Sequence, residues 1–525
     1  MNKIQVLDCT LRDGGYCNQW QFGAKNIKKI TQSLVSASID IIECGFLTEK
    51  IDKYDENVTK FDSIDKIRPF IPEEKNNKLF VAMVNYGEYD IEKLPVHDGK
   101  SIDGIRVAFH KKQLTPALEM CKAIKAKGYE VFIQAMVSLS YTDEEFLELI
   151  EKANEIEPYA FYIVDSFGMM KQKDLIRLFY MVEHNLKENI WIGFHSHNNM
   201  QLAYSNAQSL AEVKTNRNLI IDSSIYGMGR GAGNLNTELF VEYLNENIGT
   251  EYKIKPLLNV IDEVLNDFYQ QNYWGYSLPN YLSAAHNAHP NYAMYLDDKK
   301  TLTIKDMNEI FDMMDEDKKY SYDKNYIERL YIEYMSHRSG QKNVAAVSEK
   351  IKDRDVLIIA PGKSSVLEKD KIATFIKKNN VIVMSINFDY KLVKTDYIFI
   401  SNLRRFDELD KHNRYKCITT SNIPSDDVYA VVNYCDLIND KEAVEDNAGM
   451  MAIKMLILFG AKKVYLAGLD GYSHDSSDNY GDKSMEFMAK SDVSDKRNEG
   501  MKAVLKEFSS QIPIEFITEN RHFLH

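Results

Sequence analysis

The sequence lacks the features of a disulfide-stabilised, a membrane-spanning or a nucleic-acid-binding protein. Its six cysteines stand singly along 525 residues, which indicates reduced thiols in a cytoplasm. No apolar run approaches the roughly 20 residues of a membrane-spanning helix, and the opening stretch MNKIQVL lacks the apolar core of a signal peptide. No long basic run accompanies the formal net charge of −13, so neither nucleic acid nor an anionic membrane is an expected partner.

Residues 1–250 alternate β-rich runs with amphipathic stretches. Near-continuous apolar strands followed by helices predict a parallel sheet covered by helices, and eight such units in about 250 residues are the size of a (β/α)8 TIM barrel. The segment 52–71 is ambiguous, so the count could be off by one. The eight expected strands are Ile4–Asp8, Ile39–Cys44, Leu79–Val84, Gly104–Phe109, Glu130–Met136, Ala160–Asp165, Asn189–His195 and Leu219–Ser224.

Two further parts are expected after the barrel. Residues 251–345 are helical in pattern and rich in aromatic residues, and they predict a helical extension that ends in a polar linker at 336–343. Residues 350–525 again alternate strands with helices and predict a separate doubly wound, Rossmann-like α/β domain.

Polar motifs fall at the carboxyl ends of the predicted barrel strands, where active sites of this fold lie. Asp13 follows the first strand, and His195 and His197 end the seventh. Two histidines two positions apart on a strand face the same side, so these three side chains can ligate one divalent cation. Imidazole and carboxylate ligands suit Mn²⁺, our first expectation, and also Mg²⁺, Co²⁺ or Zn²⁺.

Arg12 stands beside this expected cation. A 2-oxo acid can chelate a cation through its keto and carboxylate oxygens, and a guanidinium can hydrogen-bond the enolate oxygen that develops next. The pair therefore predicts an enzyme that makes or breaks a carbon–carbon bond, with pyruvate or another 2-oxo acid and an aldehyde as substrates.

Five motifs together resemble the DRE-TIM metallolyase (HMG-CoA lyase-like) superfamily: T-L-R-D-G at 10–14, E-x-G at 43–45, D-S at 165–166, H-x-H at 195–197 and G-x-G-x-G-A-G-N at 227–234. Within it, residues 1–345 are most similar to 4-hydroxy-2-oxovalerate aldolase-like proteins. The resemblance implies that Asp13, His195 and His197 are metal ligands.

The resemblance also assigns roles next to the ligands. It implies that Asn234 either is a fourth ligand or contacts the ligands without binding the metal. It further implies that Arg12 stabilises the enolate and that Glu43 orients Arg12 or a metal-bound water.

Other residues at the same rim are expected site residues with open alternatives. Asp165 either hydrogen-bonds within the site or caps the strand end, and Ser166 could touch the substrate carboxylate. Gly231 and Gly233 allow close approach to a ligand or simply form a tight turn. Arg106 either binds a carboxylate or phosphate of the acceptor or forms a charge pair inside the barrel.

The chain departs from its relatives at the proton-transfer residue. The 4-hydroxy-2-oxovalerate aldolases carry a histidine shortly after R-D-G, where this chain has Gly14-Gly15-Tyr16-Cys17-Asn18. The HMG-CoA lyases carry a cysteine in the loop after strand eight, and residues 226–234 contain none. Tyr16 is one candidate, if the cation or Arg12 lowers its pKa. Further candidates, if the helical extension folds over the barrel mouth, are His286, His289 and Tyr292.

The motifs of the C-terminal domain indicate its ligand less directly than the barrel motifs do. A-P-G-K-S-S at 360–365 follows a strand and opens a helix, a place where phosphates bind, but it lacks the Walker and G-x-G-x-x-G spacings. Residues 460–472 resemble MptE-like domains, which implies a nucleotide or nucleotide-sugar site; a domain that only mediates assembly is the alternative. Expected ligand-binding positions at strand ends are Asp470, Asn387 and Ser401.

The leading hypothesis is a divalent-metal-dependent aldolase or lyase that makes an unusual sugar for a surface glycan, as a homodimer in the cytoplasm. One alternative is a Claisen-type acyl-CoA acyltransferase of the isopropylmalate synthase kind. The other is a barrel without turnover that serves as a binding or assembly module.

Overall fold

The computed structural model describes residues 3–299, 302–337, 340–475, 478–482 and 491–520. The chain divides into two compact units: an N-terminal unit of residues 1–295 and 314–322, and a C-terminal unit of residues 296–313 and 323–525. The helices expected at 251–345 are thus shared between the two units.

The N-terminal unit is built on a closed barrel of parallel strands. β1 pairs with β9 on one side and with β2 on the other, which closes the ring. The predicted (β/α)8 barrel is therefore confirmed. The barrel strands are β1 (Ile4–Asp8), β2 (Ile41–Leu47), β4 (Leu79–Asn85), β5 (Gly104–Phe109), β6 (Glu130–Ala135), β7 (Ala160–Asp165), β8 (Trp191–Ser196) and β9 (Leu219–Ser223).

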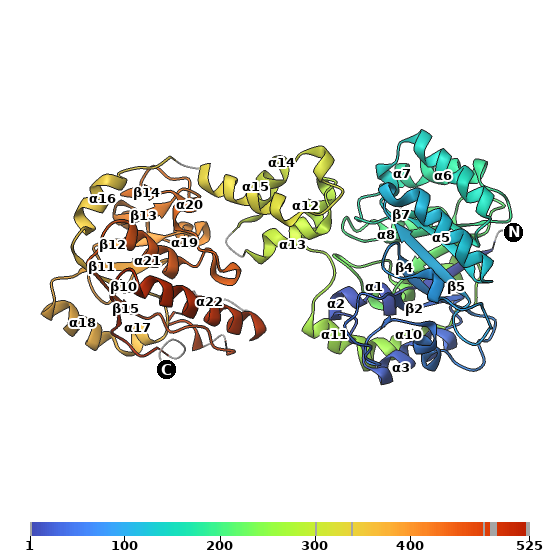
Figure 1. Ribbon diagram of the computed structural model, residues 1–525, viewed down its shortest axis with the longest axis horizontal. Helices are drawn as coiled ribbons and strands as arrows, with labels where there is room; N and C mark the ends of the chain where they lie inside the picture. Colours follow the sequence, from blue (N-terminus) through green and yellow to red (C-terminus); the bar gives the residue numbers. More distant parts are fainter. Residues whose placement is uncertain (1–2, 300–301, 338–339, 476–477, 483–490, 521–525) are drawn as a thin grey trace. The chain divides into compact units, whose positions relative to one another are not determined.

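The ambiguous segment 52–71 adds no ninth barrel strand. Its short strand β3 (Lys60–Phe61) pairs with the end of β2, outside the ring. Helices that follow the strands surround the barrel (Figure 1). They are α3 (Ala24–Ser36), α4 (Ile64–Ile67), α5 (Leu114–Ala126), α6 (Asp143–Ile156), α7 (Gln172–Asn185), α8 (Ala203–Ala211), α9 (Thr237–Asn247) and α10 (Ile254–Val260). The short helices α1 (Thr10–Asp13) and α2 (Gly15–Asn18) directly follow β1 at the carboxyl end of the barrel.

The barrel strands are apolar because both of their faces are buried: β5 and β7 have no exposed residue. Helix α6 begins with a capping box that Thr142 and Glu145 form. After the barrel come α11 (Asn266–Gln271), α12 (Leu278–Ala285), α13 (Pro290–Asp298), α14 (Ile304–Asp312) and α15 (Lys324–His337).

The C-terminal unit contains a seven-stranded parallel sheet, which confirms the predicted Rossmann-like domain. The order β14-β13-β12-β11-β10-β15-β16 reverses direction between β10 and β15. The strands are β10 (Asp355–Ile359), β11 (Ile382–Ile386), β12 (Tyr397–Ile400), β13 (Cys417–Thr420), β14 (Ala430–Val432), β15 (Lys463–Ala467) and β16 (Ile514–Phe516). The helices are α16 (Val344–Ile351), α17 (Ser364–Leu367), α18 (Lys369–Lys378), α19 (Leu403–Asp407), α20 (Tyr434–Leu437), α21 (Ala448–Leu458) and α22 (Ser491–Ser509). Within the described ranges, no helix is both long and apolar enough to cross a lipid bilayer.

Candidate metal centre

Three buried side chains converge at the carboxyl end of the barrel. Asp13 ends α1, the short helix directly after β1, and His195 and His197 lie at the end of β8 and just beyond it. One potential ligand atom from each lies within 4.8 Å of the other two. The predicted ligand residues are thus brought together.

Both histidines are anchored through the same ring nitrogen. His195 Nδ1 lies 2.9 Å from Asp222 Oδ2, and His197 Nδ1 lies 3.1 Å from the carbonyl oxygen of Asp165. These acceptors place the ring hydrogen on Nδ1 and leave the Nε2 lone pair for a ligand, the usual arrangement of metal-binding histidines. His197 Nε2 is buried 3.3 Å from Asp13 Oδ2 and completes no hydrogen bond with the described residues. The donor set therefore fits a divalent cation.

The surroundings keep these groups in the protonation states that bind cations. Burial alone would raise the pKa of Asp13, but Arg12 and the two histidines outweigh it and hold that pKa well below its usual value. Burial lowers the pKa of His195, although Asp222 opposes the shift. Asp13 is therefore anionic and His195 neutral at neutral pH.

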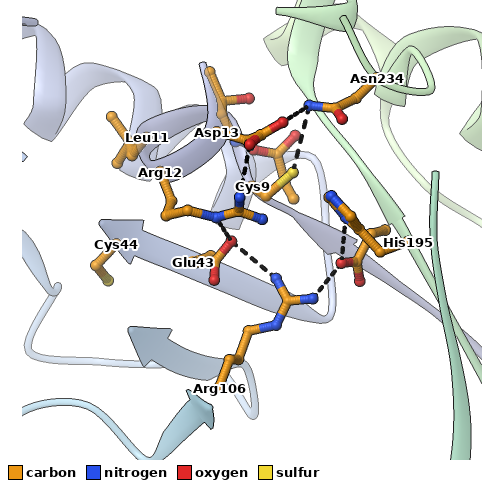
Figure 2. Close-up of polar contacts among 12 residues, drawn as sticks. Cys9, Leu11, Arg12, Asp13, Glu43, Cys44, Arg106, His195 and Asn234 are labelled. Carbon is orange, nitrogen blue, oxygen red and sulfur yellow. Dashed lines mark hydrogen bonds and ion pairs between the residues drawn. The ribbon is translucent and has the colours of Figure 1, made fainter. Parts of the chain in front are cut away.

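Arg12 and Asn234 both hold the Asp13 carboxylate (Figure 2). Arg12 Nη1 donates to Asp13 Oδ1 at 2.6 Å, and Asn234 Nδ2 donates to Oδ2 at 2.6 Å. Arg12 Nη2 and Asn234 Oδ1 are buried and have no hydrogen-bond partner in the described part of the chain. Because buried polar atoms are rarely left unpaired, these two atoms mark a place for a bound ligand.

A buried charge network extends from Arg12 across the barrel to His195. Arg12 Nε donates to Glu43 Oε2 at 2.9 Å, and Arg106 Nη1 donates to the same oxygen at 2.8 Å. The other arm of Arg106 pairs with Asp222. Arg106 is fully buried, so it forms the charge pair inside the barrel and is placed to fix Glu43 and Asp222 rather than to reach an acceptor.

The barrel domain is similar to a known family and to known proteins. Residues 3–264 match the HMGL-like family. The barrel domain belongs to the DRE-TIM metallolyase superfamily. A 4-hydroxy-2-oxovalerate aldolase of Pelotomaculum thermopropionicum is 27% identical over 274 residues, which cover 50% of this chain and 77% of the relative. One from Carboxydothermus hydrogenoformans is 29% identical over 282 residues, with the same coverage of 50% and 77%.

A solved structure, the HMG-CoA lyase from Brucella melitensis, is 16% identical with a TM-score of 0.41 and covers 52% of this chain and 99% of that chain. The predicted superfamily is confirmed by the family match and the aldolase relatives, and so is the enzyme class, a metal-dependent aldolase or lyase. The likeness of the C-terminal residues to MptE-like domains stays a prediction.

In this metallolyase barrel, Asp165 acts on His197 through its backbone. Its carboxylate accepts the N–H groups of Met169 and Met170 at 3.0 and 3.1 Å, which is the strand-end cap. The hydroxyl of Ser166 accepts the N–H of Val137 at 2.8 Å. A catalytic role for Asp165 and a substrate contact of Ser166 stay predictions.

The glycine-rich loop packs directly against the metal centre. A Cβ on Gly229 would lie 2.2 Å from Asn234 Nδ2 and 3.0 Å from Asp13 Oδ2, so only glycine fits there. Gly231 and Gly233 have φ values of 65° and 82°, and a Cβ on Gly233 would lie 2.1 Å from the Gly227 carbonyl oxygen. The loop is a tight turn that leaves room for Asn234 to reach Asp13.

Tyr16 and part of the helical extension lie together at the barrel mouth. The Tyr16 ring lies 5.4 Å from the guanidinium of Arg230, and Arg230 Nη2 lies 3.1 Å from His289 Nε2. The helical extension therefore reaches the barrel mouth at His289. Burial and Arg230 lower the pKa of His289 to about 3.

The other candidates for proton transfer differ in their surroundings. Removal of water by the surrounding chain raises the pKa of Tyr16, although 43% of the residue is exposed. This direction is opposite to the lowering that a base needs. Tyr292 is fully buried, and its hydroxyl donates to the carbonyl oxygens of Lys318 and Ser321. His286 is half-buried.

Sequence reasoning missed two residues of the centre, Asp222 and Gly229. Asp222 is the one acid in the apolar run of β9, Leu219–Ser223, and an acid inside an otherwise apolar barrel strand was the available signal. Gly229 belongs to the G-x-G motif, but only its approach to Asn234 shows why it must be glycine.

Proposed function

We propose that this protein makes or breaks a carbon–carbon bond between the enolate of a 2-oxo acid, pyruvate first, and an aldehyde. Asp13, His195 and His197 would hold the divalent cation, with Asn234 next to them. One observation carries the proposal: two histidines anchored through Nδ1 lie beside an arginine whose Nη2 has no partner among the described residues.

When bound, the cation would polarise the keto group of the 2-oxo acid and so favour loss of a proton from the adjacent carbon. Arg12 would donate its Nη2–H to the enolate oxygen. Glu43 and Asp13 already bind Nε and Nη1 of this guanidinium, so Arg12 need not move as negative charge develops on the enolate oxygen. The 2.9 Å contact of Glu43 with Arg12 Nε supports a positioning role for Glu43.

Tyr16 is proposed as the proton donor to the acceptor. When the new bond forms, the aldehyde oxygen becomes an alkoxide, and the Tyr16 hydroxyl would supply the proton that this oxygen needs. The raised pKa of Tyr16 keeps its hydroxyl protonated at neutral pH. The centroid of its ring lies 4.8 Å from that of Trp20, and Trp20 Nε1 donates to the Arg12 carbonyl oxygen at 2.8 Å. Trp20 therefore connects Tyr16 to the residue proposed to stabilise the enolate.

Relatives named 4-hydroxy-2-oxovalerate aldolase support a 4-hydroxy-2-oxo acid as the compound that is cleaved. Further parts of the proposal are Mn²⁺ as the metal, a nucleotide or nucleotide-sugar bound by the C-terminal unit, and a role in making a sugar for a surface glycan. A cytoplasmic homodimer stays a prediction.

The test is release of pyruvate from 4-hydroxy-2-oxo acids by protein loaded with Mn²⁺, compared with protein treated with a chelator. Metal-dependent release supports the proposal. Release of free thiol from acetyl-CoA in the presence of a 2-oxo acid would instead identify the acyltransferase. A folded protein that binds Mn²⁺ and does neither would be a binding or assembly module.

A further inference from the structure

The C-terminal unit contains a pocket at the carboxyl edge of its sheet. The pocket has a volume of about 410 Å³ and is lined by segments that follow β10, β11, β12 and β15. It lies where the strand order reverses between β10 and β15, the place where open parallel sheets bind their ligands. Its volume falls within the range of roughly 300–1,000 Å³ that holds small organic molecules. Asp470, Asn387 and Ser401, the three positions expected from the sequence, all line it.

The first turn after β10 is not free for a phosphate. Asp470 is buried, and its carboxylate accepts both the backbone N–H and the hydroxyl of Ser364. An internal carboxylate thus occupies the position that an anion would take at the start of α17. Its negative charge would repel a phosphate placed there, so the sequence expectation for residues 360–365 does not describe the anion site.

Cations gather elsewhere around the pocket. Arg404 and Arg405 open α19 after β12, and Arg404 Nη2 donates to the Leu302 carbonyl oxygen at 2.9 Å, which fixes its direction. Arg405 Nη1 pairs with Glu408 Oε2 at 3.1 Å, and Arg497 lines the same pocket. The basic residues lining the pocket outnumber its acids, Glu408, Asp446 and Asp470; they are Lys299, Arg404, Arg405 and Arg497. Guanidinium groups are the preferred partners of phosphate oxygens because they donate two parallel hydrogen bonds.

The other part of the pocket wall is polar without a net positive charge. Asn447 caps α21 through Oδ1, which accepts the N–H groups of Gly449 and Met450. Asn387 adopts a left-handed φ of 59°, and its Oδ1 accepts the Ser401 N–H at 3.2 Å. Together with Asp470, these amides offer acceptors and donors of the kind that bind hydroxyl groups.

We propose that this pocket binds a phosphate ester of a hydroxyl-rich molecule, with the phosphate on Arg404 and Arg405 and the sugar hydroxyls toward Asp470. Nucleotides and sugar phosphates share this chemistry. The inference assigns a pocket and phosphate-binding residues to the ligand proposed above for the C-terminal unit; it depends neither on that ligand being a nucleotide nor on the aldolase reaction of the barrel.

The experiment is isothermal titration of the full-length protein with UDP, CDP, ADP, GDP and glucose 6-phosphate, each compared with its unphosphorylated nucleoside or sugar. At least one phosphorylated compound should bind once per chain, about tenfold or more tighter than its counterpart. If glucose 6-phosphate binds and none of the nucleotides does, the nucleotide proposal is rejected and the phosphate-binding site is still supported. Equal binding of phosphorylated and unphosphorylated forms, or no binding by any of them, would overturn the inference.

Substitutions of the two arginines test which residues bind the phosphate. Arg404→Gln and Arg405→Gln should each weaken binding about tenfold or more. Arg405→Gln is the second variant because Arg404 also holds the Leu302 carbonyl and its loss could affect folding. Arg354→Gln is the matched control, since Arg354 precedes β10 at the opposite edge of the sheet. Wild-type affinity in both folded variants would overturn the assignment.

Discussion

Asp222 determines which nitrogen of His195 faces the metal centre. Its Oδ2 lies 2.9 Å from Nδ1 of that histidine, and the same carboxylate pairs with Arg106. Arg106 in turn holds Glu43, which holds Arg12. The residue that orients a proposed metal ligand and the residue proposed to stabilise the enolate therefore belong to one buried network.

Asp222→Asn should weaken metal binding about 10–100-fold, because a neutral amide anchors the imidazole of His195 less firmly. The substitution also removes one of the two carboxylates that pair with the buried Arg106. Titration with Mn²⁺ measures this affinity. Asp262→Asn, on an exposed acid of the same unit, is the control and should bind as the wild type does. A folded Asp222→Asn protein with unchanged Mn²⁺ affinity would contradict the positioning role.

Gly229→Ala should also weaken Mn²⁺ binding, although it changes no charge. The added methyl group would lie 2.2 Å from Asn234 Nδ2 and must displace that side chain from Asp13. Gly340→Ala is a matched control, since its Cβ would meet nothing within 4 Å. Equal affinities in the two variants would show that the close approach at Gly229 does not matter.

Tyr16→Phe should reduce condensation of pyruvate with an aldehyde by about 10²–10⁴-fold, the usual contribution of a positioned proton donor. Mn²⁺ affinity should stay the same because Tyr16 is not a ligand. Tyr180→Phe is the control: Tyr180 is 42% exposed, close to the 43% of Tyr16, but lies on α7. If Tyr16→Phe and Tyr180→Phe both catalyse condensation at the wild-type rate, Tyr16 is not the donor.

Asp8→Asn should flatten part of the pH dependence of stability. Burial raises the pKa of Asp8 from 3.8 to about 6, although Thr237 and Thr10 hydrogen-bond its carboxylate. The folded state therefore binds a proton more tightly than the unfolded state. The contribution of Asp8 to stability is full below about pH 4 and is lost as pH rises through 6, by about 3 kcal/mol. Urea unfolding of both proteins between pH 4 and 7 measures it; parallel curves would refute the assignment.

Strand positions were largely predictable because their signal is local. The limits of β5 and β7 agree with the predicted ranges, since both are continuous apolar runs with a clear end. β2 runs on to Leu47, three residues past the predicted end at Cys44. Gly45, which reads as a break in the sequence, sits at φ 145° in an irregular stretch between Glu43 and Phe46, after which the strand continues and pairs with β3.

The grouping of Asp13, His195 and His197 was predictable for a different reason: the motifs that contain them are specific as a set. The partners of those residues were not, because they depend on packing across the barrel. No spacing in the sequence tells that Arg106 on β5 joins Glu43 on β2 to Asp222 on β9. The same holds for Asp470, whose carboxylate fills the turn that the sequence pattern offered to a phosphate.

Deuterium exchange into the methyl group of pyruvate, followed by NMR, tests the central claim most directly because it needs no aldehyde. The wild-type protein with Mn²⁺ should catalyse exchange, and both chelator treatment and Asp13→Asn should abolish it. Exchange that persists without metal or without Asp13, or its absence in a wild-type protein with Mn²⁺ bound, would contradict pyruvate enolate formation at this centre.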